Sequence, residues 1–118
     1  MSATDAERIA IADSYLQALL SRDGASVPFH PKAVRKEAGM RTGFSGAHLT
    51  RSLTSGPQYK LVKGIREKNW SVDGDNVLVD FLLDARGVPK PLHVYETFLI
   101  PADDPRIRRI DVRFRRPR

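Results

Sequence analysis

The sequence predicts an α+β fold, in which an N-terminal helix and a second helix cover the concave face of a cone-shaped, curved antiparallel sheet. Two patterns carry this prediction. Apolar residues recur at helical spacing near the start of the chain, and from residue 59 onward long segments rich in alternating apolar and polar residues are separated by short turns. Strands that follow one another through short turns favour an antiparallel meander. A chain of 118 residues has the usual size of one domain, so we expect a single domain over residues 1–118.

The first helix is expected over residues 5–22. Thr4 and Glu7 match a capping box, in which each of the two side chains accepts a hydrogen bond from the other residue's backbone N–H group. The Asp-Gly pair at 23–24 provides a stop signal. Tyr15 lies on or beside the apolar face of this helix. That face consists of Ile9, Ala12, Leu16, Leu19 and Leu20.

The middle of the chain is expected to hold a short strand and a second helix. Residues 25–31 indicate a loop or one short helical turn, and residues 33–38 indicate a short strand. Ser45 can cap the second helix, and the Gly-Pro pair at 56–57 ends it. The apolar positions of this helix are Leu49 and Leu53.

Four long strands complete the predicted fold. They are expected over residues 59–72, over residues 77–84, in a segment that runs to Ile100, and over residues 107–115. The first two are joined by Asp-Gly-Asp-Asn at 73–76, which is typical of a hairpin turn. Two prolines precede the third strand and place its start at an edge or a bulge.

The third of these strands carries one acidic residue on an otherwise apolar face. Successive side chains of a strand point to opposite faces, so Glu96 shares its face with Leu92, Val94, Phe98 and Ile100. Burying an ionised carboxylate without a partner is costly, and such a group pairs, takes up a proton or lines a wet cavity. Glu96 is therefore either a satisfied structural group or part of a site.

The positive charge of the chain is concentrated at its end. The formal net charge is +6, and seven arginines but one acid lie between Arg106 and Arg118. A basic patch of this kind can bind nucleic acid, anionic lipid or an acidic partner. However, apolar residues alternate with the charged ones at 109–115, which is typical of a strand with one solvated face. We therefore expect no nucleic-acid partner.

Several other classes of protein are disfavoured by composition. The start of the chain is polar and acidic, unlike a signal peptide, and no apolar run approaches a membrane helix in length, so we expect no membrane contact and a cytoplasmic location. The chain contains no cysteine, and His30, His48 and His93 are isolated, so no metal site is expected. Without a glycine-rich phosphate loop or a nucleophile elbow, we expect no cofactor.

Five stretches of the chain, taken in order, resemble the nuclear transport factor 2-like superfamily, which includes the SnoaL-like polyketide cyclases and ketosteroid isomerase. ADSYLQALLSRD at 12–23 is similar to its first helix, and AVRKE at 33–37 to its first strand. FSGA at 44–47 resembles the start of its later helix, and VYETF at 94–98 and IRRIDV at 107–112 resemble its last two strands. The resemblance spans nearly the whole chain and implies a cystatin-like α+β fold with a pocket between the first helix and the sheet.

The resemblance to ketosteroid isomerase implies three catalytic positions. In that enzyme a carboxylate removes a proton while a tyrosine and a protonated acid stabilise the oxyanion. At the matching positions Glu37 would be the base, and Tyr15 and protonated Glu96 would be the donors. The chain departs from the isomerase because both acids are Glu instead of Asp, and because Arg35 and Lys36 flank Glu37 and either could form an ion pair with it.

Two functions remain open at this point. The first is a noncatalytic ligand-binding or dimerisation module with an apolar pocket, and the second is a cofactor-free isomerase, dehydratase or cyclase that acts on a small apolar compound. Relatives commonly pair through the outer sheet face, so we expect a homodimer formed by the faces that carry Asp80, His93, Tyr95 and Thr97. The residues expected to line the pocket are Leu16, Leu19, Leu53, Trp70, Phe81, Val94, Phe98, Val112 and Phe114.

Overall fold

The computed structural model describes residues 2–115 and contains two α-helices, two short 3-10 helices and six strands within that range. The helical elements are α1 (Asp5–Ser21), η1 (Gly24–Ser26), α2 (Gly46–Ser55) and η2 (Pro57–Leu61). The strands are β1 (Phe29–Glu37), β2 (Met40–Gly43), β3 (Val62–Asp73), β4 (Asn76–Ala85), β5 (Leu92–Leu99) and β6 (Ile107–Arg115).

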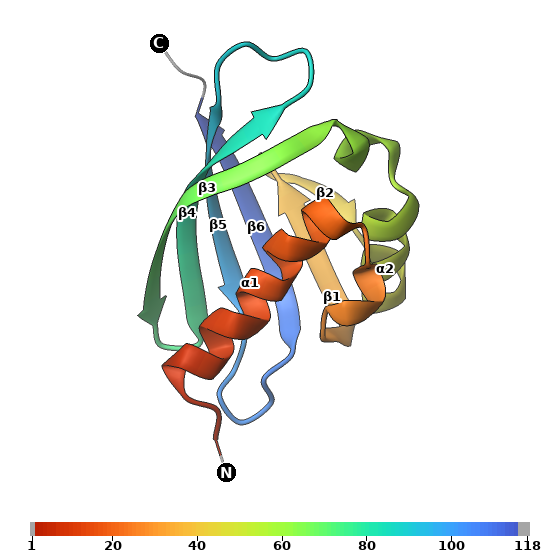
Figure 1. Ribbon diagram of the computed structural model, residues 1–118. Helices are drawn as coiled ribbons and strands as arrows, with labels where there is room; N and C mark the ends of the chain where they lie inside the picture. Colours follow the sequence, from red (N-terminus) through yellow and green to blue (C-terminus); the bar gives the residue numbers. More distant parts are fainter. Residues whose placement is uncertain (1, 116–118) are drawn as a thin grey trace.

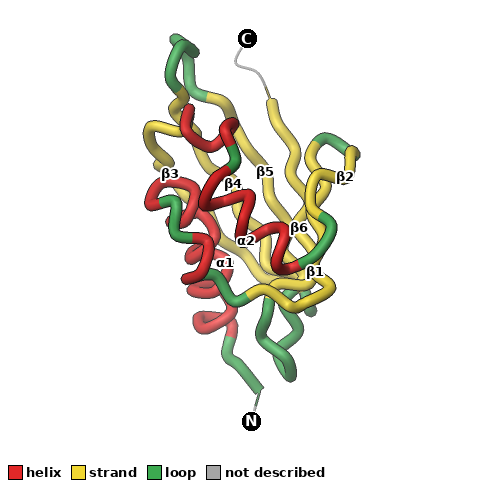
Figure 2. Tube along the Cα trace, turned by 90° about the vertical axis from the view of Figure 1, so that its right-hand side faces the viewer, coloured by secondary structure: helices red, strands yellow, loops and turns green. Residues whose placement is uncertain are grey.

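All of these strands form one curved sheet in the order β2-β1-β6-β5-β4-β3. The strands β3 to β6 form the predicted antiparallel meander. In contrast, β1 pairs with β6 in parallel, so the sheet as a whole is mixed. Figure 1 shows α1 crossing in front of the sheet, with α2 beside β1 and β2. Figure 2, turned by 90°, shows the strands curving around the two helices and leaving the sheet unclosed.

The two helices begin where their caps predict. The Thr4 hydroxyl accepts from the backbone N–H of Glu7, and the Glu7 carboxylate accepts from the backbone N–H of Thr4, each at 3.1 Å. Arg22 adopts a left-handed conformation after α1, and the hydroxyl of Ser45 accepts from the backbone N–H of His48 at the start of α2. The predicted helices are therefore confirmed almost to the residue.

The strands depart from the prediction at the start of the sheet. β1 is longer than expected, and the sequence reasoning missed β2, which forms a hairpin with β1. The predicted strand over 59–72 begins only at Val62, because Tyr59 and the two residues after it belong to η2. The hairpin turn at 73–76 and the bounds of β6 are as predicted.

The core lies between the helices and the concave face of the sheet. α1 packs mainly against β3 and β4, and α2 packs against β1 and β2. The concave face of β5 presents Val94, Glu96 and Phe98, all buried, whereas its other face is only half-buried. The α+β fold with a curved sheet covered by two helices is thus confirmed.

Candidate functional site

A cavity of about 290 Å³ opens between α1, η2 and the concave face of the sheet. Tyr15 and Leu19 enter it from α1, and most of the other lining side chains are apolar. Exposed apolar side chains of Leu61, Val88 and Phe114 lie at its rim. This volume is at the lower end of the range for small-molecule pockets. The full lining consists of Tyr15, Leu19, Glu37, Tyr59, Leu61, Val62, Phe81, Leu83, Ala85, Val88, Leu92, Val94, Glu96, Val112 and Phe114.

Two carboxyl groups face this cavity from either side of one valine. Glu37 of β1 and Glu96 of β5 are both register partners of Val112 on β6. Directly opposed residues in neighbouring strands share a face of the sheet, so both side chains point to the concave side. Two strand spacings separate their Cα atoms by about 10 Å. The parallel pairing of β1 with β6 therefore brings the two acids into one site.

Glu96 is a buried acid, and one of its carboxyl oxygens has no hydrogen-bond partner among the described residues. Its side chain is 4% exposed, and its Oε2 atom has no hydrogen-bond partner among the described residues. Burial, with a smaller contribution from the charge of Glu37, raises the pKa of Glu96 to about 8, against the lowering effect of Arg35. At neutral pH the carboxyl group is therefore mainly protonated and can act as a hydrogen-bond donor.

Tyr15 lines the same cavity, with its ring packed edge-on against Phe98 at a centroid distance of 5.6 Å. Its hydroxyl oxygen accepts a hydrogen bond from Nη1 of Arg35 at 3.2 Å. Burial raises the pKa of Tyr15 well above its ordinary value, against the lowering effect of Arg35. The phenol therefore stays protonated at neutral pH, and its own O–H remains available as a donor.

Arg35 connects these groups and is the largest of the fully buried side chains. Its Nε lies 3.5 Å from Oε1 of Glu37, whose side chain is 24% exposed. The guanidinium also lies over the ring of Tyr59, 5.3 Å from the ring centroid. Of the two basic neighbours that could pair with Glu37, the structure thus selects Arg35, because Lys36 alternates to the other face of β1 and is exposed.

An irregularity in the β1–β2 pairing accommodates Arg35. The register shifts between Arg35 and Lys36, which leaves Thr42 as an extra residue on β2. The hydroxyl and the carbonyl oxygen of Thr42 both accept from the guanidinium, at 3.0 and 3.2 Å. A Cβ atom on Gly43 would collide with Leu49 and lie 2.9 Å from Cβ of Arg35, so only glycine leaves room here.

The structure brings together eight of the twelve residues predicted for the site. The three predicted catalytic residues all line the cavity. Of the predicted ligand-binding residues, Leu19, Phe81, Val94, Val112 and Phe114 line it as well. The other four do not line it: Leu16, Leu53 and Phe98 are buried in the core, and Trp70 is half-buried and packs against it.

Sequence reasoning missed several lining residues at the mouth of the cavity. Leu83 follows Phe81 by two residues and Leu92 precedes Val94 by two, so each lies on the same strand face as a predicted lining residue. Extending the alternation along each strand would have found both. Tyr59, Leu61 and Val88 carry no such signal, because they lie in a 3-10 helix and a loop.

The described residues contain no group of three or more metal-ligating side chains. Over the same range, every helix is too short or too polar to cross a membrane.

On the convex face, His93 Nε2 lies 3.0 Å from Asp80 Oδ1, and Tyr95 stacks on His93 at a centroid distance of 4.5 Å. The arginines at positions 116 and 118 of the basic end lie outside the described residues.

Comparison with solved structures supports the fold. A nuclear transport factor 2-like protein of unknown function from Cytophaga hutchinsonii is 10% identical, with a TM-score of 0.71 over 98% of this chain and 93% of that one. A putative polyketide cyclase from Sinorhizobium meliloti is 25% identical, with a TM-score of 0.67 over 87% and 93%. A steroid delta-isomerase from Pseudomonas aeruginosa is 19% identical, with a TM-score of 0.66 over 92% and 80%.

These similarities establish the nuclear transport factor 2-like, SnoaL-like fold, and a further neighbour described as having a cystatin-like fold agrees with it. No curated protein matches the sequence significantly. The sequence profile of one family, described as Domain of unknown function (DUF8021), matches residues 1–114. The chain therefore belongs to that family, and its fold is that of the nuclear transport factor 2-like superfamily.

Proposed function

We propose that the domain binds a small, mainly apolar molecule that carries a hydrogen-bond acceptor such as a carbonyl group. The observation that carries this proposal is the Oε2 atom of Glu96, which is buried and has no hydrogen-bond partner among the described residues. A buried polar group without a partner costs about 1–3 kcal/mol, and a ligand acceptor that meets it recovers part of that cost. The apolar lining of the cavity supplies the remaining affinity.

The ligand proposal predicts that the protein prefers a ketone to a hydrocarbon of the same shape. Indanone and indane form a suitable pair, because they differ in one carbonyl group. We expect indanone to bind about tenfold more tightly at pH 6, where protonated Glu96 can donate to the ketone. Glu96→Leu should remove this preference and leave the affinity for indane nearly unchanged. Ligand-induced changes in the amide spectrum of the protein would give both affinities.

Two controls make the ketone experiment specific. Glu96→Gln keeps an N–H donor at the same position, so it should retain a preference for indanone. Glu67→Gln changes an exposed glutamate on β3 and should behave as the wild type. Equal binding of the two probes by the wild type would contradict the assignment of Glu96 as the ligand's donor, and binding of neither would contradict the ligand proposal for compounds of this size.

A second candidate function is a cofactor-free isomerase, dehydratase or cyclase, with Glu37 as general base. It is favoured by one specific observation: Glu37, Tyr15 and Glu96 line the same cavity. In this proposal the carboxylate of Glu37 removes a proton from the carbon next to a carbonyl group, and the electron pair of the broken C–H bond moves toward the carbonyl oxygen. The O–H groups of Tyr15 and protonated Glu96 would stabilise the resulting enolate.

Proton exchange tests the enzymatic proposal without knowledge of the natural substrate. If Glu37 acts as a base, the protein should accelerate exchange of the indanone α-protons with D₂O, and Glu37→Gln should lower the catalysed rate by about 100-fold or more. Proton NMR of the ketone follows the exchange directly. The variant should still bind indanone, which separates loss of the base from loss of the site. Exchange no faster than in buffer would leave the noncatalytic function as the better description.

We further propose that two copies associate through the convex face of the sheet in the cytoplasm. The half-buried side chains of Asp80, His93, Tyr95 and Thr97 support the choice of this face, because they lie on neighbouring strands β4 and β5 and combine polar and aromatic groups. Sedimentation equilibrium of the wild type and of a Tyr95→Glu variant would test it, with a monomeric wild type contradicting the proposal.

A further inference from the structure

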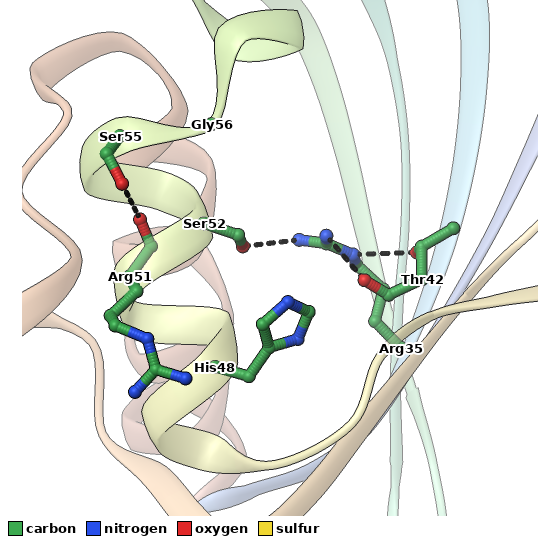
Figure 3. A pocket seen from close by; sticks show the side chains of 7 residues that line it. All are labelled: Arg35, Thr42, His48, Arg51, Ser52, Ser55 and Gly56. Atoms are coloured by element: carbon green, nitrogen blue, oxygen red, sulfur yellow. Dashed lines mark hydrogen bonds between the residues drawn. The ribbon is translucent and has the colours of Figure 1, made fainter.

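A second hollow lies on the other side of Arg35, between α2 and the β1–β2 hairpin. It has a volume of about 330 Å³ and is lined mainly by polar side chains. Figure 3 shows His48 and Ser52 on α2, with Arg35 and Thr42 facing the helix from β1 and β2. None of its lining residues is acidic. They are Arg35, Thr42, His48, Arg51, Ser52, Ser55 and Gly56.

The buried charge of Arg35 has one carboxylate partner, and its other partners are neutral. The guanidinium donates four hydrogen bonds, and all of their acceptors are neutral oxygens, on Thr42, Tyr15 and Ser52. Its carboxylate partner, Glu37, lies 3.5 Å away on the side of the apolar cavity. A buried arginine is stabilised only when its charge is well paired. A negatively charged group in the hollow would lie close to this buried charge and would be attracted by it.

Three further polar groups border the same hollow from α2. Arg51 is exposed and forms no ion pair with any described carboxylate. Nδ1 of His48 accepts from the backbone N–H of Phe44 at 3.2 Å, so the ring proton of the neutral imidazole resides on Nε2. The hydroxyl of Ser52 donates to the carbonyl oxygen of Leu49, and its oxygen lies 3.5 Å from Nη1 of Arg35.

We propose that this hollow is a binding site for a small oxyanion, such as the phosphate or carboxylate group of a metabolite, held by Arg51 and His48 and attracted by the buried charge of Arg35 behind them. The site is separate from the apolar cavity, and the proposal does not depend on the function proposed for that cavity. Charge-assisted hydrogen bonds from a guanidinium are the strongest that a protein offers to such groups. The absence of acidic side chains from the lining leaves this attraction unopposed.

Inorganic phosphate and acetate are the probes that test the oxyanion site. Each is titrated into the protein at constant ionic strength, with chloride as the replaced anion, because net positive charge attracts any anion at low salt. We expect saturable changes in the amide signals of Thr42, His48 and Ser52 and in the Nε–H signal of Arg35. The probe that saturates at the lower concentration identifies the preferred oxyanion.

A charge-matched pair of variants decides whether the site is specific. Arg51→Gln should weaken binding by about tenfold or more, because it removes a charged donor at the hollow. Arg86→Gln removes the same charge from an exposed turn outside the hollow and should leave the affinity within about twofold. Absent or non-saturating changes with both probes, or equal weakening in the two variants, would overturn the proposal.

Discussion

The folded state should lose stability as the pH rises from about 4.5 to about 8, and Glu96 should be the main cause. The carboxyl group of Glu96 has a folded-state pKa of about 8, against a reference value of 4.5. Between these two values the folded protein retains the proton while the unfolded chain releases it. Since the folded state binds more protons, the free energy of unfolding falls with increasing pH.

The size of this loss follows from the same two values. Each pH unit between them costs about 1.4 kcal/mol, so the whole interval amounts to about 5 kcal/mol. The stabilising contribution is complete below pH 4.5 and is lost by about pH 8. Urea denaturation at several pH values between 4 and 9 would measure it, because the midpoint and slope give the free energy of unfolding.

Glu96→Gln isolates the contribution of this group from those of all other acids. The amide does not titrate, so the difference in unfolding free energy between wild type and variant should change by about 5 kcal/mol across the interval. Glu67→Gln, on the exposed surface, should leave the pH profile of the wild type unchanged. A Glu96→Gln profile parallel to that of the wild type would mean that Glu96 is ionised in the folded protein, and the donor role proposed for it would then be wrong.

Arg35→Met should destabilise the protein by about 3 kcal/mol, although it replaces a buried charge with an unbranched apolar side chain. The reason is that its partners remain. The hydroxyl of Tyr15 and the carbonyl oxygen of Thr42 would lose their donor, and Glu37 would lose its counter-charge. Removing one member of a buried polar network costs more than removing the whole network. Chemical denaturation at pH 7 would give the difference.

The partners of Arg35 offer an internal check on this explanation. If the loss of the counter-charge contributes, adding Glu37→Gln to Arg35→Met should cost less than Glu37→Gln costs in the wild type. Arg86→Met serves as the matched control, because Arg86 is exposed and should tolerate the change with little loss of stability. An Arg35→Met variant as stable as the wild type would show that desolvation of the guanidinium offsets all of its hydrogen bonds.

Local patterns in the sequence were sufficient for most of the elements. The capping box at Thr4, the cap at Ser45 and the turn at 73–76 are set by residues within a few positions of one another, so they can be recognised without the fold. The same is true of Glu96, whose apolar neighbours on one strand face already indicated a buried acid. Glu96 could therefore be predicted as a candidate site residue without knowing which distant parts of the chain contact it.

The boundary between cavity and core was not predictable in the same way. Leu16, Leu53 and Phe98 have the periodicity of inward-facing residues, and they do face inward, but other side chains cover them completely. The hydrophobic periodicity of a sequence indicates which face of a helix or strand is buried. Whether a gap remains there depends on how far α1 stands from the sheet, which the packing of all elements decides together.

The α+β class, the curved sheet and an acid on an otherwise apolar strand face could be predicted from the sequence alone, because hydrophobic period, capping and turn chemistry are local. The tertiary structure decided what surrounds that acid. The parallel pairing of β1 with β6 places Glu37 and Glu96 on either side of Val112. Arg35 can point inward only because oxygens from α1, β2 and α2 meet around its guanidinium. Groups so far apart in the chain leave no joint signal in it, and only the fold brings them within hydrogen-bonding distance.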